Sequence, residues 1–286
     1  MNSSNNLNVI YSLSTAPFFA KKMNTQFEVD KFELYTAALS SLTRQKEGNI
    51  TIMHCDKHAY DYIKQKGLLN LWSEVRITLP DNFYDEKSQT KIDARMFWAA
   101  GKLFALRATQ SPVLMLDTDF IAWKLPKLSN KIIAAHHEDL SPNVYPPISH
   151  FEMNEEYTFA EELDYEIKPL NTAFLYLPCE EFKQFYIEHS LEFMRNSKSC
   201  DDYLTYMVYA EQRLLPMLAK LKGAETETLL NFPNLNENNE HYTHIWGAKQ
   251  VMRDNPKELE RFLAKCRKRI RHDFPECEWI ISKIES

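Results

Sequence analysis

The stretch PVLMLDTDFIAW, residues 112–123, places two aspartates one residue apart at the end of an otherwise apolar run. A short apolar run of this kind is typical of a buried strand, which we predict over residues 111–117. In open parallel sheets, ligands collect at the carboxyl ends of the strands. Because residues i and i+2 of an extended segment point the same way, Asp117 and Asp119 are expected to converge on one site there.

The sequence before this stretch alternates between strand and helix patterns. Apolar runs predict strands over 8–13, 49–55 and 73–79, and helical spacing predicts helices over 29–46, 59–72 and 91–109. Residues 14–22, with Pro17, are predicted to be a loop. This alternation is typical of βαβ units, so we predict an α/β fold with a mostly parallel central sheet and helices on both faces.

The second half of the chain is less regular. Strands are predicted over 131–140, 169–178 and 226–233, and helices over 180–197 and 201–221. Pro216 is expected to kink or restart the second of those helices. Residues 141–167 form a long irregular segment, and loops of this length are usually functional or mobile. We predict one catalytic domain over residues 1–254 and a helical tail over 255–286 that packs on it or extends from it.

Composition restricts the function further. A net charge of −6 argues against general binding to nucleic acid or to an anionic membrane. The N-terminus lacks a basic segment followed by an apolar one, and no stretch approaches 18 consecutive apolar residues. We therefore expect a cytoplasmic protein without a transmembrane segment. The five scattered cysteines include no CxxC pair and are expected to be free thiols.

The few glycines exclude the common phosphate-binding loops. Only five are present, and neither a GxGxxG nor a GxxxxGK motif can be found. A cation held by Asp117 and Asp119 is an alternative device, because two carboxylates this close need a positive partner. Oxygen ligands favour Mn²⁺ or Mg²⁺, which bridge phosphates. The alternative interpretation is an ordinary strand exit, in which one aspartate caps a turn and the other is solvated.

At this point the chain resembles the GT-A fold nucleotide-sugar glycosyltransferases, most closely the glycogenin-like and bacterial lipopolysaccharide galactosyltransferase-like group. The similarity lies in KLFALRATQSPVLMLDTDFI, with Lys102, and in the later segments KIIAAHHED and LNTAFLYL. It implies that Lys102 and Thr118 bind a nucleotide-sugar donor, preferably a UDP-sugar. The diphosphate of this donor would be bridged by Mn²⁺ or Mg²⁺ to Asp117 and Asp119. The implied acceptor is a hydroxyl group, for example on a bacterial surface glycan, and the group's usual outcome is retention of configuration.

A second motif lies in HYTHIWGAKQ, residues 241–250. The family often ends its catalytic domain with HxxGxxK, which His244 and Gly247 match, whereas Lys249 comes one residue early. The resemblance implies that His244 completes the metal site and that Lys249 contacts the diphosphate. His241, three residues away, is a competing ligand.

The resemblance also assigns weaker positions. It implies that Ser12 and Ser14 bind the nucleoside, that Asn171 and Thr172 bind the donor sugar, and that Gln212 is catalytic together with Asp117 and Asp119. Glu211 and Gln212 resemble the family's Asp-Gln pair, whereas Ala173 replaces its usual glycine. Glu138 and Asp139 are candidate acceptors for sugar hydroxyls.

Two other functions remain open. Asp117 could be the nucleophile of a haloacid dehalogenase-type phosphatase, with Asp119 as acid/base and Asp201 and Asp202 as its late acidic pair. Alternatively, a GT-A-like domain could bind a nucleotide or glycan without catalysis. The basic run over 265–271 is either a peripheral contact with anionic lipid or a solvated helical face.

Overall fold

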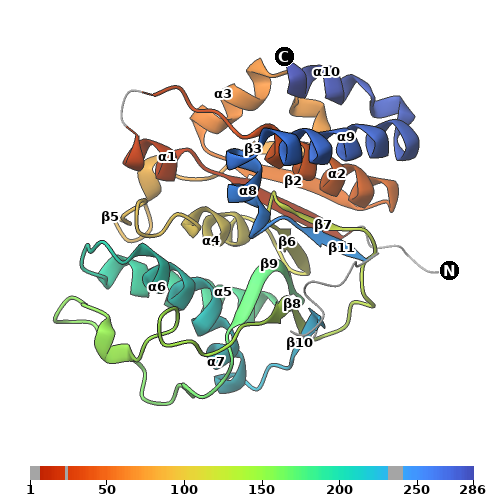
Figure 1. Cartoon of the computed structure of the whole chain (residues 1–286). Helices are drawn as coiled ribbons and strands as arrows, with labels where there is room; N and C mark the ends of the chain where they lie inside the picture. The colour runs from red at the N-terminus through yellow and green to blue at the C-terminus, as the bar shows by residue number, and fades with distance from the viewer. Residues whose placement is uncertain (1–6, 23–24, 231–240) are drawn as a thin grey trace.

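A computed structural model describes residues 7–22, 25–230 and 241–286 of the chain. Its centre is a seven-stranded sheet with the order β10-β8-β9-β6-β1-β2-β3 (Figure 1). The strands are β1 (Asn8–Leu13), β2 (Ile50–Cys55), β3 (Glu74–Ile77), β6 (Val113–Leu116), β8 (Ile132–His137), β9 (Leu170–Leu177) and β10 (Thr226–Leu230). Only β9 runs antiparallel to its neighbours in this sheet. The predicted α/β class with a mostly parallel sheet is confirmed.

Successive residues of the central strands enter separate hydrophobic cores on the two faces of the sheet. Ile10 and Met115 belong to one core, whereas Val9 and Leu114 belong to the other. The first core is covered by α4 (Ala100–Arg107), α5 (Glu180–Asn196) and α7 (Leu214–Leu221). The second is covered by α2 (Lys31–Lys46), α9 (Pro256–Asp273) and α10 (Trp279–Glu285). Both faces are therefore protected from water, as a mostly parallel sheet requires.

The remaining helices lie around the sheet edges and the site described below. They are α1 (Ala16–Lys21), α3 (Lys57–Gln65), α6 (Tyr203–Val208) and α8 (Ala248–Asp254), with short 3₁₀ turns at Leu69–Leu71, Asp81–Phe83, Ile148–His150 and Pro275–Cys277. In the described residues, no helix has both the length and the apolar character needed to cross a membrane.

Three sequence predictions are wrong in their details. The helix predicted over 59–72 ends at Gln65, because Gly67 adopts a left-handed conformation with φ +70°. Residues 14–22 are not a simple loop, because α1 begins there with Pro17 in its first turn, where proline is well tolerated. The long helix predicted over 91–109 is reduced to α4. Asp93 prevents the earlier start, since its Oδ1 accepts a hydrogen bond from the backbone N–H of Arg95 at 2.9 Å, a local turn that competes with a helix.

A small second sheet was not predicted, and it decides the geometry of the site. β7 (Phe120–Ala122) follows the two aspartates directly and pairs antiparallel with β11 (Tyr242–His244). The register places Phe120 opposite His244. Segments more than 100 residues apart in the chain are thereby fixed side by side (Figure 1).

The predicted interruption before Pro216 takes the form of a π-helical turn. Tyr209–Arg213 is π-helical between α6 and α7, and α7 begins two residues before the proline. Proline removes one helical hydrogen bond, and the wider turn accommodates the change. The turn carries Glu211 and Gln212 at the surface of the site.

Segment 141–167 is irregular, as predicted, and covers α5, α6 and the π-helical turn. Its aromatic side chains Phe151 and Phe159 pack against Phe193 and Tyr209. The Arg213 guanidinium donates hydrogen bonds to backbone carbonyls of Tyr165 and Ile167. The segment is thus attached at several points to the elements that carry the site.

A small hairpin is formed by β4 (Tyr84–Asp85) and β5 (Thr90–Lys91). At the C-terminal end, α9 packs against α2, and Leu263, Cys266 and Ile270 of α9 are buried in the second core. The limits of the catalytic domain and its tail remain a prediction, but these helices share a core with the sheet.

Candidate active site

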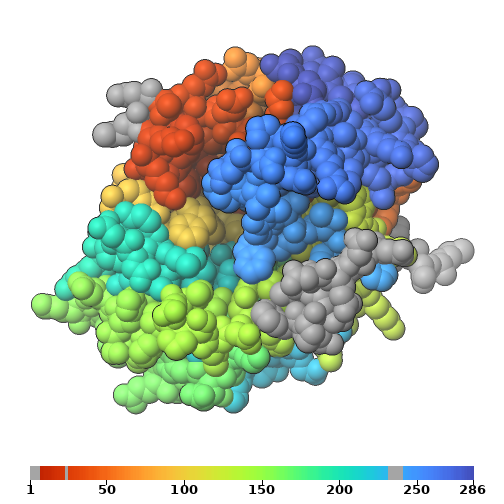
Figure 2. All heavy atoms as spheres, viewed as in Figure 1, coloured from red at the N-terminus to blue at the C-terminus, as the bar shows by residue number. Residues whose placement is uncertain are grey.

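A pocket of about 390 Å³ opens at the sheet edge where β1 and β6 end and where antiparallel β9 begins. In Figure 2 the surface is hollowed where the segments of α4, α6 and α8 meet. The lining residues are Ser12, Trp98, Ala99, Lys102, Asp117, Thr118, Asp119, Asn171, Thr172, Ala173, Leu204, Val208, Glu211, Gln212, His244, Trp246 and Lys249. Of the residues to which the resemblance assigns catalysis, nucleotide-sugar binding or the metal, all except Ser14 are among them.

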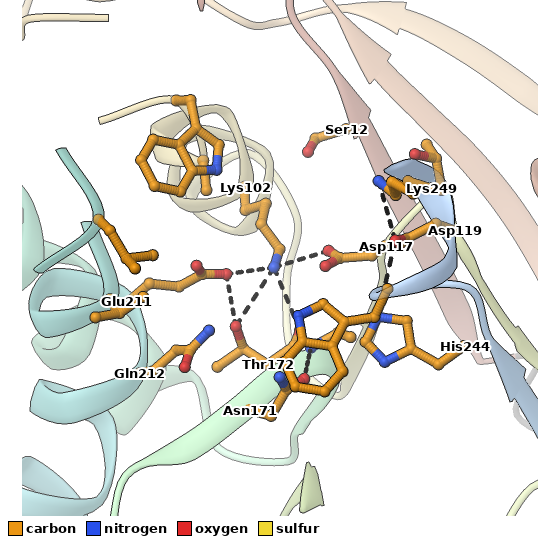
Figure 3. A pocket seen from close by; sticks show the side chains of 17 residues that line it. Ser12, Lys102, Asp117, Asp119, Asn171, Thr172, Glu211, Gln212, His244 and Lys249 are labelled. Atoms are coloured by element: carbon orange, nitrogen blue, oxygen red, sulfur yellow. Dashed lines mark hydrogen bonds and ion pairs between the residues drawn. The ribbon is translucent and has the colours of Figure 1, made fainter. Parts of the chain in front are cut away.

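Lys102 is the centre of the first charged group in this pocket. Its ammonium lies 2.7 Å from Asp117 Oδ1 and donates to Glu211 Oε1 as well as to Thr172 Oγ1 at 3.3 Å (Figure 3). Thr172 Oγ1 in turn donates to Glu211 Oε1 at 2.5 Å. Lys102 therefore fixes the first aspartate of the motif relative to the π-helical turn.

The second charged group surrounds Asp119. The chain turns between the two aspartates, since the N–H of Phe120 donates to Asp117 O at 3.0 Å. Asp119 Oδ2 lies 3.8 Å from His244 Nε2 and 3.0 Å from Lys249 Nζ (Figure 3). Lys249 also contacts Glu33 Oε1 of α2 at 2.8 Å. The β7–β11 pairing and the first turn of α8 bring these side chains together.

These two groups carry an excess of negative charge. Their four carboxylates, Asp117, Glu211, Asp119 and Glu33, face two lysine ammonium groups, Lys102 and Lys249. Asp119 is only 5% exposed, so solvent screens this imbalance poorly. The pocket can accept a divalent cation without leaving an excess of positive charge.

Burial and charge determine the protonation of the site. Burial lowers the pKa of His244 to about 4, so the imidazole is neutral at neutral pH. Burial also lowers the pKa of Lys102 and Lys249, but neighbouring carboxylates outweigh this effect and raise both. Burial, with Asp119 and Glu211 nearby, raises the pKa of Asp117 against the opposing charge of Lys102.

The donor set fits a divalent metal ion in part. Two carboxylates and a neutral imidazole suit Mn²⁺, and the Asp119–His244 pair is already close. However, in the described residues no group of three or more acidic, histidine or cysteine side chains is placed so that it could hold a metal ion. Mg²⁺ is commonly held by one or two carboxylates plus substrate phosphates. A cation on Asp119 and His244 would fit this pattern, with Asp117 nearby.

The predicted donor-sugar residues Asn171 and Thr172 lie beside the lysine group. Asn171 Nδ2 donates to Glu138 Oε1 at 2.9 Å, and its Oδ1 accepts from Ala173 N at 3.1 Å. The side chain is thereby held at the pocket wall. Ala173 also accepts the Asp117 N–H at its carbonyl oxygen, at 2.9 Å. The glycine that the resemblance leads us to expect is therefore replaced by alanine at a position that contacts Asp117 of the DxD motif.

The predicted nucleoside residues are separated by the structure. Ser12, at the end of β1, lines the pocket, whereas the Ser14 hydroxyl donates to Asp56 Oδ2 at 2.9 Å outside it. Thr118, between the aspartates, also lines the pocket.

Gln212 reaches the pocket from the π-helical turn. Its Oε1 accepts a hydrogen bond from the Tyr145 hydroxyl at 2.6 Å, which orients the amide. π-Helical turns occur frequently at functional sites. Glu211, only weakly indicated by the sequence, has the more central position because Lys102 and Thr172 both contact it.

Several other candidates lie outside the pocket. Asp139 pairs with Lys168 at 3.0 Å, and Glu138 accepts a hydrogen bond from the side chain of Asn171. Asp202 caps α6 and Asp201 accepts a hydrogen bond from Tyr203. The competing histidine, His241, is not among the pocket residues.

Sequence reasoning missed Glu33, Trp98, Leu204 and Trp246. Glu33 lies in the first turn of α2, far in sequence from either motif, and no local signal identifies it. Trp246 had a signal, since it lies inside HYTHIWGAKQ next to Gly247. Exposed apolar residues such as Trp98 and Leu204 become recognisable only when the pocket is known.

Comparison with known proteins gives distant structural similarity only. No protein-family model matches the sequence, and no curated protein matches it significantly. The chain is similar in structure to PaToxG glycosyltransferase, with a TM-score of 0.44 and 9% identity over 98% of this chain and 83% of that one. It is also similar to a 4-diphosphocytidyl-2C-methyl-D-erythritol synthase from Anaerococcus prevotii, with a TM-score of 0.35 and 11% identity over 82% of this chain and 91% of that one. For the galactosyltransferase LgtC, solved with donor and acceptor sugar analogues, the TM-score is 0.37 and the identity 10%, over 71% of this chain and 70% of that one. Similarity at this level does not establish a shared activity.

Proposed function

We propose that this protein is a metal-dependent glycosyltransferase that moves a sugar from a nucleotide-sugar donor to a hydroxyl group. One observation carries the proposal. Asp119, at the end of the DxD motif, lies 3.8 Å from His244 in a pocket that also holds two lysines and Asp117. A mixed carboxylate and imidazole pair with excess negative charge suits a divalent cation, and the lysines suit a diphosphate.

The residues have separate roles in this proposal. Asp119 and His244 would hold Mn²⁺ or Mg²⁺ with Asp117 nearby, and the cation would supply positive charge for the leaving diphosphate. His244 binds without losing a proton at neutral pH, because burial lowers its pKa to about 4. Lys249 adds positive charge at the same end of the pocket.

At the opposite end, Lys102 holds Asp117 and Glu211 in fixed positions. Gln212 presents its amide to the donor sugar, and Asn171 and Thr172 form the adjacent wall. A UDP-sugar is the preferred donor, and transfer with retention is inferred from the resemblance alone. Preorganised charges of this kind stabilise developing negative charge on the leaving group.

The phosphatase alternative has less support. Its late acidic pair would have to join Asp117 in the pocket, but Asp201 and Asp202 are engaged elsewhere, with Tyr203 and with the α6 N-terminus. The non-catalytic alternative is suggested by Ala173, which also lines the pocket, and by the displaced Lys249. That lysine lines the pocket and contacts Asp119 despite its offset.

Calorimetric titration tests the proposal directly. Wild-type protein should bind UDP measurably in Mn²⁺ and at least tenfold more weakly in EDTA. Asp119→Asn should lose the Mn²⁺ dependence, whereas Asp139→Asn, a matched change outside the pocket, should retain it. Release of UDP from a panel of UDP-sugars should require Asp119 as well.

The competing functions give different results. Binding of inorganic phosphate with the same Mn²⁺ dependence, together with hydrolysis of phosphate monoesters, would favour the phosphatase. Mn²⁺-dependent UDP binding without release of UDP from any sugar donor would favour a binding domain. Full Mn²⁺-dependent UDP binding in Asp119→Asn would refute the proposed site.

A further inference from the structure

Three large apolar side chains are exposed around the mouth of the pocket. Trp98 is 36% exposed, Leu204 48% and Trp246 57%, and all three line the pocket. Single exposed apolar residues are common, but a group of them beside a charged pocket marks a contact surface.

Trp98 and Leu204 form one wall, which is distinct from the metal end of the pocket. The backbone N–H of Ala99 lies 3.3 Å from Met207 Sδ, so the segment before α4 packs directly on α6. Ala99 and Val208 continue the apolar lining of this wall. Trp246 belongs to the other end, because its ring stacks on His244 at a centroid distance of 6.1 Å.

The chemistry of the Trp98 wall restricts its ligand. Among the described residues, the Trp98 indole N–H has no hydrogen-bond partner, and the Lys21 ammonium lies over its ring, 5.6 Å from the ring centroid. Glu211 lines the same pocket and offers its carboxylate as an acceptor for a hydroxyl group. A suitable ligand therefore has an apolar face for the indole and hydroxyl groups for these polar partners.

A pyranose ring has this combination, with C–H groups on its faces and hydroxyls on its edge. A lipid chain would need a longer apolar groove than these few side chains provide. A phosphate group would leave the Trp98 wall without favourable contacts. The pocket volume of about 390 Å³ lies in the range of small-ligand sites.

We propose that Trp98 and Leu204 bind a pyranose ring of the acceptor, so that the acceptor is a saccharide. The proposal rests on the proposed function, since it places the acceptor beside the donor site. The hydroxyl that receives the sugar would then lie between the Trp98 wall and Asp117.

Saturation-transfer NMR on the full chain tests this assignment. The probes are methyl glycosides of glucose, galactose, mannose and N-acetylglucosamine, each measured with and without Mn²⁺ and UDP. At least one probe should receive saturation at its ring C–H protons. Trp98→Ala and Leu204→Ser should each reduce that signal at least fivefold, and Trp98→Phe should restore part of it.

Leu221→Ser is the matched control, because Leu221 is 42% exposed but lies on α7 outside the pocket. It should leave the signal unchanged, and all four variants should bind UDP as wild type does. The proposal would be overturned if no methyl glycoside received saturation in the NMR experiment. It would also be overturned if the signal were unchanged in both Trp98→Ala and Leu204→Ser. Transfer of sugar to a peptide hydroxyl but to no saccharide would also overturn it.

The two proposals fail in distinguishable ways. Pyranoside binding that depends on Trp98, without Mn²⁺-dependent UDP binding, would reject the transferase and leave a saccharide site. Intact UDP binding without pyranoside binding would reject only the saccharide acceptor.

Discussion

Replacement of Lys249 by methionine should strengthen Mn²⁺ binding and weaken UDP binding in the same protein. The Lys249 ammonium lies 3.0 Å from Asp119 Oδ2 and 2.8 Å from Glu33 Oε1. In the protein without metal it therefore neutralises the carboxylate that the cation needs. Once a diphosphate is present, the same positive charge attracts the ligand.

The size of the effect follows from the distances. Two unit charges about 4 Å apart interact by about 4 kcal/mol at an effective dielectric constant of about 20. The Lys249 side chain is 29% exposed, so its flexibility and solvent screening reduce the net effect to about 1–2 kcal/mol. That corresponds to about a tenfold change in each affinity.

Isothermal titration calorimetry measures both changes. Mn²⁺ titrated into Lys249→Met should bind about tenfold more tightly than to wild type, and UDP in saturating Mn²⁺ about tenfold more weakly. Lys168→Met is a suitable control, because Lys168 also pairs with an aspartate but lies outside the pocket.

The essential result is that the affinity for Mn²⁺ and the affinity for UDP change in opposite directions. If Lys249→Met weakened Mn²⁺ and UDP binding together, Lys249 would be organising the site and would not be competing for Asp119. If neither affinity changed while Lys168→Met behaved as wild type, the cation would bind away from Asp119 and the site would need to be reassigned.

Two further predictions concern stability. Burial lowers the pKa of His54 to about 4, so the unfolded state binds more protons below pH 6.5 and stability falls as pH decreases through that range. His54 should contribute about 2 kcal/mol to the loss of stability between pH 7 and pH 5. Unfolding measured over this range should therefore show a shallower loss in His54→Gln than in wild type, and equal slopes would contradict the assignment. Deletion of residues 255–286 removes Leu263, Cys266 and Ile270 from the core and should yield a protein that does not fold, whereas a stable truncated protein would show that the tail is separate.

Much of the fold could be predicted because local patterns agree with it. Apolar runs identified the seven strands of the central sheet, in part for β10, whose predicted end over 231–233 lies outside the described residues. The helix over 91–109 was wrong because an Asp93 turn and the burial of Phe97 override helical spacing. The Asp93 turn is a local effect, whereas the burial of Phe97 is a tertiary effect that has no local signal in the sequence.

The candidate site could likewise be predicted only in part from the sequence. Strand periodicity and the topology of parallel sheets are enough to place Asp117 and Asp119 at the end of a buried strand, because both follow from the local pattern of residues. The contact of His244 and Lys249 with Asp119 depends on the pairing of β7 with β11, so it becomes visible only in the folded chain. Glu33, Trp98 and Leu204 likewise reach the pocket through packing between distant helices, which one-dimensional patterns do not encode.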